Sequence, residues 1–190
     1  ENYMALLGKK DCSKSDEYAA LLKISVEELD PTPASMMAYG EYLYANGKKS
    51  EGITKMKEAI AMETDAANKS SMTFKVVQRI YNSGNYKKAF SMAKSVTGKD
   101  KGDALVIMAK CVASTASKCG SSTFERKSTY WLALDYLNKA SAAGKSASSL
   151  KAKYCAAAPT LSEAFENGKQ AGDSVSISCW GESSKVRNCK

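Results

Sequence analysis

The sequence predicts an all-α fold: a right-handed α-solenoid of three to four helical hairpins, followed by a small C-terminal β-hairpin. Apolar residues recur three and four positions apart along most of the 190 residues, which is the spacing of one helix face. Glycines suited to ending a helix recur at an interval, since Gly84 stands 37 residues after Gly47. Near the C-terminus the period changes to two, because Val175, Ile177 and Cys179 alternate with serines, which indicates a strand.

Residues 1–30 are expected to form helices that pack on the hairpin array. Asp30 ends this region, because a residue that precedes proline is disfavoured in the helical conformation. Thr32 and Pro33 then suit the start of the next helix. A threonine side chain accepts a hydrogen bond from a free helix N–H group, and proline fits the first helical position.

Helical hairpins are predicted across residues 31–168. In the first hairpin, Gly52 provides the small residue that a close helix crossing requires, and it follows the turn glycine Gly47 by five positions. Ala89 follows Gly84 at the same distance, so the second hairpin repeats the pattern of the first. The four units are placed at about 33–66, 70–99, 103–143 and 146–168.

The third predicted hairpin contains an insert of about ten residues, most of them in the polar segment 117–127, before a second helix that starts at Tyr130. Inserts in a solenoid lie at one edge, where they form either a plain loop or a binding loop. Both alternatives stay open at this point. Thr160 and Glu163 match the capping box that begins a short last helix.

Residues 169–190 are expected to form a β-hairpin that caps the last helices, with a turn at 181–184 and a return strand from Val186. An isolated hairpin is only marginally stable in water, so we expect Trp180 to hold it on the helices. Cys179 and Cys189 flank the predicted turn. They are the candidate disulfide pair.

The six cysteines also bear on the compartment. Cys111 and Cys119 cannot pair within one helix, because eight helical residues span about 12 Å and bridged Cα atoms lie within about 7 Å. An even number of cysteines suits an oxidising compartment, so we expect the periplasm or cell envelope. A cytoplasmic chain with reduced thiols is the alternative. The chain shows no signal peptide and begins with Glu1, so we expect a mature product or a trimmed chain.

The first two hairpins resemble the tetratricopeptide repeat (TPR) family. Its 34-residue pattern places a large residue, Gly and Tyr in one helix, Gly at the turn, and small residues in the second helix. The chain departs from this pattern in lacking the Trp and the closing Pro and in its longer interval. The region from Tyr130 to Cys189 also resembles the C-terminal regions of exported bacterial TPR proteins. The resemblance of the hairpins is carried by Met36, Tyr39, Gly40, Leu43, Gly47, Gly52, Met56 and Ala59, and by Val77, Ile80, Gly84, Ala89, Ala93 and Val96.

The resemblance implies a concave groove, lined by the first helix of each hairpin, that binds a peptide or a protein. Tyr44 and Tyr81 fall at equivalent positions in it and offer aromatic area with a polar tip. Met37 and Phe74 belong either to this groove or to the packing between hairpins. The groove residues carried over from the family are Met37, Glu41, Tyr44, Phe74, Gln78, Tyr81 and Lys110.

Composition argues against catalysis. The chain has no histidine, which removes the commonest general base and metal ligand. It also has no Cys-x-x-Cys pair and no phosphate-binding glycine loop. Ser148 and Lys151 form a Ser-x-x-Lys pair without companion motifs. We therefore expect no enzyme, no cofactor and no metal site.

The charge is distributed along the helices. Lys and Arg number 28 against 20 Asp and Glu, a net charge of +8. Arg79, Arg126 and Arg187 are the only arginines, and arginine is the residue best suited to phosphate and base contacts. We therefore expect no nucleic-acid partner, and assign the lysines to solvated helix faces or to attraction toward an acidic partner. No apolar run approaches the roughly 20 residues of a membrane span.

The expected function is non-catalytic binding of a peptide or protein in the groove. The alternative is a structural spacer or assembly subunit of a cell-envelope complex, whose groove is filled by the chain's own N-terminal helices. The two differ in whether Tyr44 and Tyr81 lie open or covered.

Overall fold

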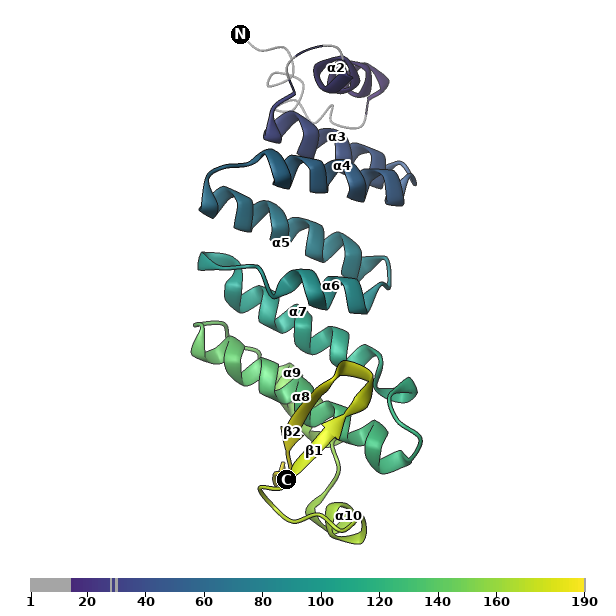
Figure 1. The fold of residues 1–190 in the computed structure, drawn as a ribbon, viewed down its shortest axis with the longest axis vertical. Coiled ribbons are helices and arrows are strands. Elements are labelled where there is room, and N and C mark those ends of the chain that lie inside the picture. The colour runs from purple at the N-terminus through teal and green to yellow at the C-terminus, as the bar shows by residue number, and fades with distance from the viewer. Residues whose placement is uncertain (1–14, 28, 30, 190) are drawn as a thin grey trace. The chain divides into compact units, whose positions relative to one another are not determined.

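The computed structural model describes residues 15–27, 29 and 31–189. The chain divides into two compact units, Glu1–Ser83 and Gly84–Lys190, each with its own internal packing. Helices dominate the described residues of both units, and a two-stranded antiparallel sheet lies in the second (Figure 1). The prediction of a mainly helical chain with a C-terminal β-hairpin is therefore confirmed. Of the predicted N-terminal helices, the part before Ser15 lies outside the described residues.

Consecutive helices of the first unit pack against one another. α2 (Asp16–Glu27) contacts α3 (Pro33–Ala45), which forms a tight pair with α4 (Lys49–Met62), and α4 contacts α5 (Ala66–Asn82). Figure 1 shows α3, α4 and α5 side by side. The buried apolar side chains of this unit include Leu22, Leu43, Met56, Ala59, Val76, Val77 and Ile80.

Local signals in the sequence place these helix ends. Thr32 and Ser35 form a capping box at the start of α3, in which each side chain accepts the backbone N–H of the other. Gly47 has a φ of +86° in the turn between α3 and α4, a conformation that glycine adopts without steric cost. The Asp65 side chain accepts the Asn68 N–H and begins α5.

Two glycines bring α3 and α4 together. A Cβ atom on Gly52 would lie 2.5 Å from the Gly40 carbonyl oxygen and 2.7 Å from the Tyr44 nitrogen. A Cβ atom on Gly40 would lie 2.8 Å from the Gly52 carbonyl oxygen. Backbones approach this closely only where neither residue carries a side chain. The role predicted for Gly52 as a close-crossing residue is therefore confirmed.

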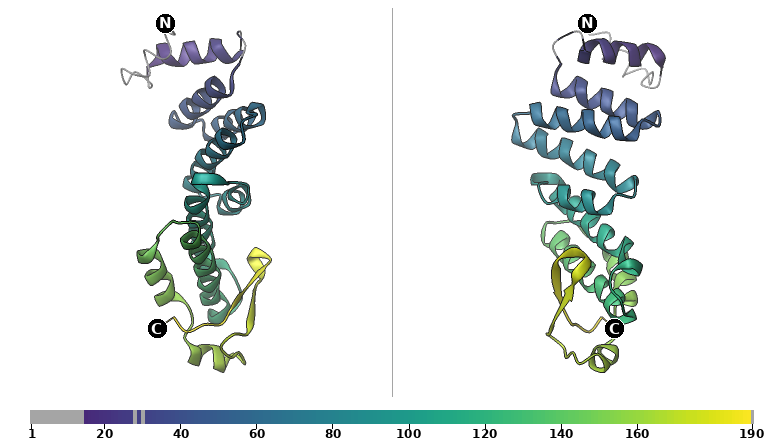
Figure 2. Two further views of the ribbon diagram at one scale, coloured as in Figure 1. Left: turned by 90° about the vertical axis from the view of Figure 1, so that its left-hand side faces the viewer. Right: turned by 45° about the vertical axis from the view of Figure 1, so that its right-hand side comes forward.

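The second unit is organised around its longest helix, α8. α8 packs on α7, α9 and both strands, and α6 packs on α7. The left view of Figure 2 places α9 and the β-hairpin on opposite sides of α8. The elements are α6 (Tyr86–Ala93), η1 (Gly98–Asp100), α7 (Lys101–Ser114), η2 (Ala116–Lys118), α8 (Thr123–Ala142), α9 (Ser148–Ala157), α10 (Leu161–Glu166), β1 (Ser174–Ile177), η3 (Ser178–Trp180) and β2 (Glu182–Lys185).

The start of α8 corrects one expectation. The helix begins at Thr123, inside the predicted insert, rather than at Tyr130. Its first turn is fixed by a capping box, because Ser122 accepts the Glu125 N–H and the Glu125 carboxylate accepts the Ser122 N–H. The capping box predicted for Thr160 and Glu163 is confirmed at the start of α10.

The C-terminal hairpin turns earlier than predicted. β1 and β2 pair antiparallel, from Ser174 opposite Lys185 to Ile177 opposite Glu182. The chain reverses through the 3₁₀ turn η3 and Gly181, whose φ of +62° is left-handed. The predicted turn at 181–184 and return strand from Val186 are therefore wrong, because β2 already ends at Lys185.

Trp180 holds the hairpin on the helices, as predicted. Its indole N–H donates to the Thr115 hydroxyl at 3.1 Å. Its ring lies 4.5 Å from the Phe90 ring, centroid to centroid, and the Lys87 ammonium lies 3.8 Å from the Trp180 ring centroid. The side chain thus joins an aromatic contact, a hydrogen bond and a cation–π contact.

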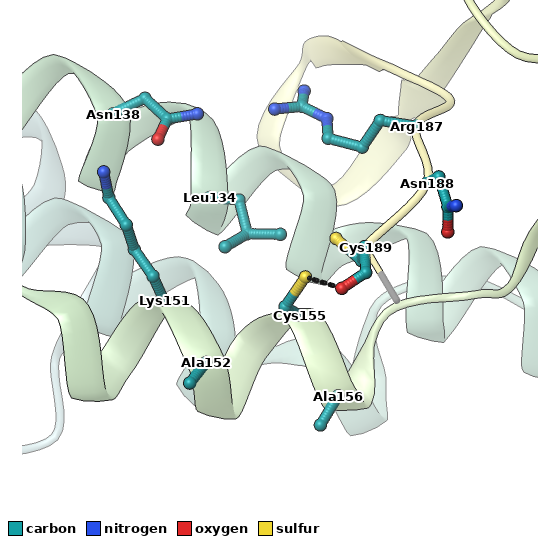
Figure 3. Close-up of a pocket in the computed structure, with 9 residues that line it drawn as sticks. All are labelled: Leu134, Asn138, Lys151, Ala152, Cys155, Ala156, Arg187, Asn188 and Cys189. Carbon is teal, nitrogen blue, oxygen red and sulfur yellow. Dashed lines mark hydrogen bonds between the residues drawn. The ribbon is translucent and has the colours of Figure 1, made fainter.

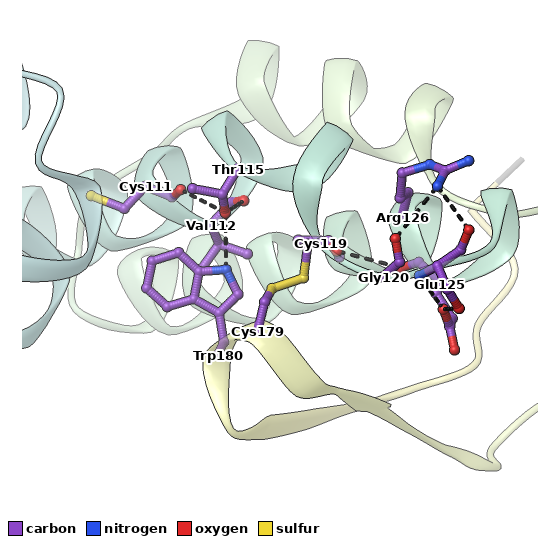
Figure 4. The surroundings of a disulfide bond; sticks show 11 residues. Cys111, Val112, Thr115, Cys119, Gly120, Glu125, Arg126, Cys179 and Trp180 are labelled. Carbon is purple, nitrogen blue, oxygen red and sulfur yellow. Dashed lines mark hydrogen bonds between the residues drawn. A yellow bond between two sulfur atoms is a disulfide. The ribbon is translucent and has the colours of Figure 1, made fainter.

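The disulfide differs from the candidate pair. Cys179 is bonded to Cys119, with their Cα atoms 5.5 Å apart (Figure 4). Cys189 is a free thiol, so the expectation of a bond between Cys179 and Cys189 is wrong. The physical reason is that α7 ends at Ser114, which places Cys119 in a non-helical segment facing the turn of the hairpin. Cys179 lies in η3 at the turn of the hairpin, whereas Cys189 follows β2 beyond its other end, so the two are not opposite each other.

Candidate functional site

The first unit contains a pocket between α3 and α5. Its volume is about 410 Å³, within the range of sites that hold small molecules or single side chains. Glu63, just after α4, closes one side. The lining residues are Ala34, Met37, Ala38, Glu41, Glu63, Asn68, Ser71, Met72 and Lys75.

The two helices present faces of identical spacing to this pocket. On each helix the lining positions are i, i+3, i+4 and i+7, which form one stripe. Each α5 residue stands 34 positions after an α3 residue: Asn68 after Ala34, Ser71 after Met37, Met72 after Ala38 and Lys75 after Glu41. The lining positions of the two helices are thus 34 residues apart, although the residue types at paired positions differ, whereas the turn glycines are 37 apart.

The difference between 34 and 37 explains where the predicted groove residues lie. α5 has 17 residues and α3 has 13, so the additional residues lie within α5. Three residues turn a helix by about 300°. The face of α5 that the 37-residue interval selects therefore lies about 60° around the helix from the face that lines the pocket. The structure places Met37 and Glu41 in the pocket. It does not bring Phe74, Gln78 and Tyr81, which the 37-residue interval selects, into the lining.

Two methionines give the pocket an apolar lining, and three charged side chains also border it. Met37 is buried and Met72 is half-buried, and the unbranched thioether adapts its shape to what it contacts. The Glu63 carboxylate accepts the backbone N–H groups of the two residues that follow it. Within the described residues, Glu41 and Lys75 have no ion pair or side-chain hydrogen bond. No described residue therefore neutralises either charge.

Tyr44 has a structural contact. Its hydroxyl donates to the Arg79 carbonyl oxygen at 2.9 Å, and the Arg79 guanidinium carbon lies 5.5 Å from the ring centroid. The side chain is half-buried and ties α3 to α5 one helical turn beyond Glu41. Tyr81 is also half-buried, while Gln78 is exposed. The tyrosines are therefore neither fully open nor covered.

The seventh predicted residue, Lys110, belongs to the second unit. It is half-buried on α7. Sequence reasoning missed Ala34, Ala38 and the four α5 residues of the pocket. No sequence signal marks them, because the residues at paired positions of the two stripes differ in type.

The second unit has a pocket of its own, of about 520 Å³. It lies between α8, α9 and the segment that follows β2 (Figure 3). Two thiols face it, since Cys155 projects from α9 and Cys189 lies on the C-terminal segment. The lining residues are Leu134, Asn138, Lys151, Ala152, Cys155, Ala156, Arg187, Asn188 and Cys189.

The described part of the chain holds no group of three or more His, Cys, Asp or Glu side chains placed to bind a metal ion. None of the helices in residues 15–27 and 31–189 combines the length and apolar character of a membrane span. In comparisons with known proteins, no family model, no curated protein and no solved structure matches the chain.

Proposed function

We propose that this chain is a non-catalytic binding module, built from TPR-like helical hairpins, that holds a peptide segment of another protein in the pocket between α3 and α5. The observation that carries this proposal is the pair of matched stripes 34 positions apart that line the pocket. In TPR-type solenoids the first helices of successive hairpins line one concave surface. In the order of the chain α3 and α5 lie on either side of α4, as two first helices would in such an array.

Features of the first unit support a hairpin repeat. The left-handed glycine at the α3–α4 turn and the Gly40–Gly52 crossing are the local devices that such a hairpin requires. Gly84 also has a positive φ, +81°, at the position corresponding to Gly47. A solenoid of three to four such units is part of the proposal.

The chemistry of the pocket defines the ligand. A volume of about 410 Å³ accommodates one or two side chains, and the Met37 and Met72 lining favours an apolar one. Glu41 attracts a positive group and Lys75 attracts a negative group, at the equivalent last positions of the two stripes. We therefore propose a peptide that combines an apolar residue with a basic and an acidic residue.

The spacer alternative draws support from two contacts. α2 packs on α3, and the Tyr44 hydroxyl is used inside the unit. Among the described residues, however, the pocket is lined by α3, Glu63 and α5, without a contribution from α2. In a self-filled groove, nuclear Overhauser effects would connect the Met37 and Met72 methyl groups to the chain's own N-terminal residues in the absence of any peptide.

The periplasm or cell envelope is the proposed compartment. The bond between Cys119 and Cys179 supports it, because disulfides persist in oxidising compartments. Titration of all six cysteines as thiols in protein isolated without reductant would favour the cytoplasm.

The test of binding is a selection of random displayed peptides on the immobilised protein, followed by fluorescence polarisation with the synthetic peptides. Ala38→Arg places a long charged side chain in the pocket and is expected to weaken binding about tenfold or more. Glu41→Lys is expected to reverse the preference for a basic residue.

The matched control is Ala142→Arg, which adds the same side chain at an exposed position of α8. It should leave the affinity unchanged, and circular dichroism should show equal helix content in both variants. A selection that returns no binder, or binders that tolerate Ala38→Arg, would contradict the proposal.

A further inference from the structure

Two free thiols lie close together in the lining of the pocket of the second unit. The Cys155 sulfur lies 2.7 Å from the Cys189 carbonyl oxygen, although the residues are 34 positions apart. Figure 3 shows the Cys155 and Cys189 sulfur atoms between α9 and the C-terminal segment. Both side chains are half-buried, so a small reagent can reach them.

The C-terminal segment is held in this place by contacts other than the thiols. Arg187 forms an ion pair with Asp135 on α8, and the Ser184 hydroxyl donates to the same carboxylate at 2.6 Å. The Val186 N–H donates to the Asp173 carbonyl oxygen at 2.9 Å, next to the last strand pair. Cys189 therefore reaches α9 on a segment whose path is fixed up to Arg187.

We infer that Cys155 and Cys189 form a second disulfide, which fastens the C-terminal segment to α9. This inference is independent of the proposed peptide binding, which concerns the first unit. The proximity of the two thiols carries it, and the bond between Cys119 and Cys179 in the same unit shows that the fold accommodates a covalent link from the hairpin region to the helices.

The bond forms by exchange with a small-molecule disulfide, such as glutathione disulfide. The thiolate of Cys155 attacks one sulfur of the reagent, forms a mixed disulfide and releases one reagent thiolate. The thiolate of Cys189 then attacks the Cys155 sulfur and releases the second. The chain loses two protons and two electrons, and the reagent becomes two thiols. Burial and the hydrogen bond with Cys155 raise the pKa of Cys189 to about 12, so the closing step accelerates as pH rises.

Cys111 provides an internal comparison. It is completely buried on α7, burial raises its pKa to about 12, and it is a free thiol. It lacks the exposure of the Cys155–Cys189 pair, and no contact with a free thiol is seen for it within the described residues. It is expected to remain reduced under conditions that oxidise the pair.

Trypsin separates these cysteines cleanly. Cys155 falls in the peptide 154–169 and Cys189 in 188–190, while Cys111 falls in 111–118. The protein is equilibrated in a glutathione redox buffer, alkylated without reductant, digested and analysed by mass spectrometry. The expected result is peptide 154–169 linked to 188–190, beside 119–126 linked to 170–185, with Cys111 unlinked.

The inference is overturned if both Cys155 and Cys189 are alkylated while the Cys119–Cys179 link is intact, or if Cys189 is linked to any other cysteine. Cys155→Ser is the matched variant and should make Cys189 alkylatable. The oxidised wild type should also melt at least about 4 °C above the Cys155→Ser/Cys189→Ser variant. If the two proteins melt at the same temperature and the linked peptide is absent, the inference is contradicted by a second measurement.

Discussion

The Gly40 carbonyl oxygen lies 2.5 Å from the position that a Cβ atom on Gly52 would occupy. The partner is backbone rather than the end of a flexible side chain, so α3 and α4 must separate to accept any larger residue. The contact between Gly40 and Gly52 also positions α3, which carries Met37 and Glu41, against α4.

Gly52→Ala is therefore expected to destabilise the first unit by about 1–3 kcal/mol, the usual cost of overpacking. This direction opposes helix propensity, which favours Ala over Gly by about 1 kcal/mol in an exposed helix. Hydrogen exchange of the α3 and α4 amides measures the effect in this unit alone.

Ser50→Ala, at an exposed position near the start of α4, is the control and should change exchange little. Slower exchange in Gly52→Ala than in the wild type would show that the two helices are not in contact through these glycines.

Tyr44→Phe removes the hydroxyl that donates to the Arg79 carbonyl oxygen. A neutral hydrogen bond contributes about 0.5–1.5 kcal/mol, so the variant should lose that amount in urea unfolding followed by circular dichroism. Tyr42→Phe is the matched control, because Tyr42 is also half-buried on α3 and its hydroxyl has no hydrogen bond within the described residues. Equal losses in the two variants would assign the effect to something other than this bond.

The lowered pKa of Glu163 predicts that the free energy of unfolding depends on pH in the acid range. The Lys127 ammonium and the Thr160 N–H lower the pKa of Glu163 to about 2. A carboxyl whose pKa is lower in the folded state contributes its full stabilisation above its unfolded pKa, near 4.3, and loses it as pH falls through the folded value. The advantage of the wild type over Glu163→Gln in urea unfolding should therefore be constant near neutrality and disappear between about pH 4.5 and pH 2.

Glu166→Gln, on the same short helix, tests whether this acid dependence is specific. The Glu166 carboxylate has no ion pair among the described residues. Its variant should parallel the wild type across the whole pH range. A loss of the same size would indicate a general effect of charge on α10.

The Cys119–Cys179 bond should stabilise the second unit by about 2–4 kcal/mol. The measurement compares Cys119→Ser/Cys179→Ser with its parent, in a background where Cys155 and Cys189 are serine so that only this bond is tested. Hydrogen exchange of β1 and β2 should accelerate in the variant, and adding a reductant should change the parent but not the variant. A parent that does not respond to the reductant would show that the bond contributes nothing to hairpin stability.

Most of the fold could be predicted from the sequence because its signals are local. Thr32 and Thr160 are helix caps that act within three residues, and both were predicted. Ser122 is an equally local cap that was missed, because α8 was expected to start at Tyr130. The turn at Gly47 depends on one backbone angle. The β-hairpin was also predicted, although its turn was placed too late because η3 shortens the first arm.

The pocket and the disulfide could not be predicted as easily because both depend on register between distant segments. Nothing in the sequence marks where the additional residues of α5 lie. The turn glycines therefore suggested that equivalent residues are 37 positions apart, whereas the residues of α3 and α5 that line the pocket are 34 positions apart. Likewise, spacing along the chain favoured Cys179 with Cys189, whereas the approach of the 119 segment to the hairpin is a tertiary property.

The bond between Cys119 and Cys179 has a consequence for limited proteolysis. The connection between α8 and α9 contains Gly144 and the exposed Lys145, which lies inside the covalent loop. A single tryptic nick there would divide the polypeptide into two pieces that still migrate together in electrophoresis, and the fragments would appear only once the sample is boiled with a thiol.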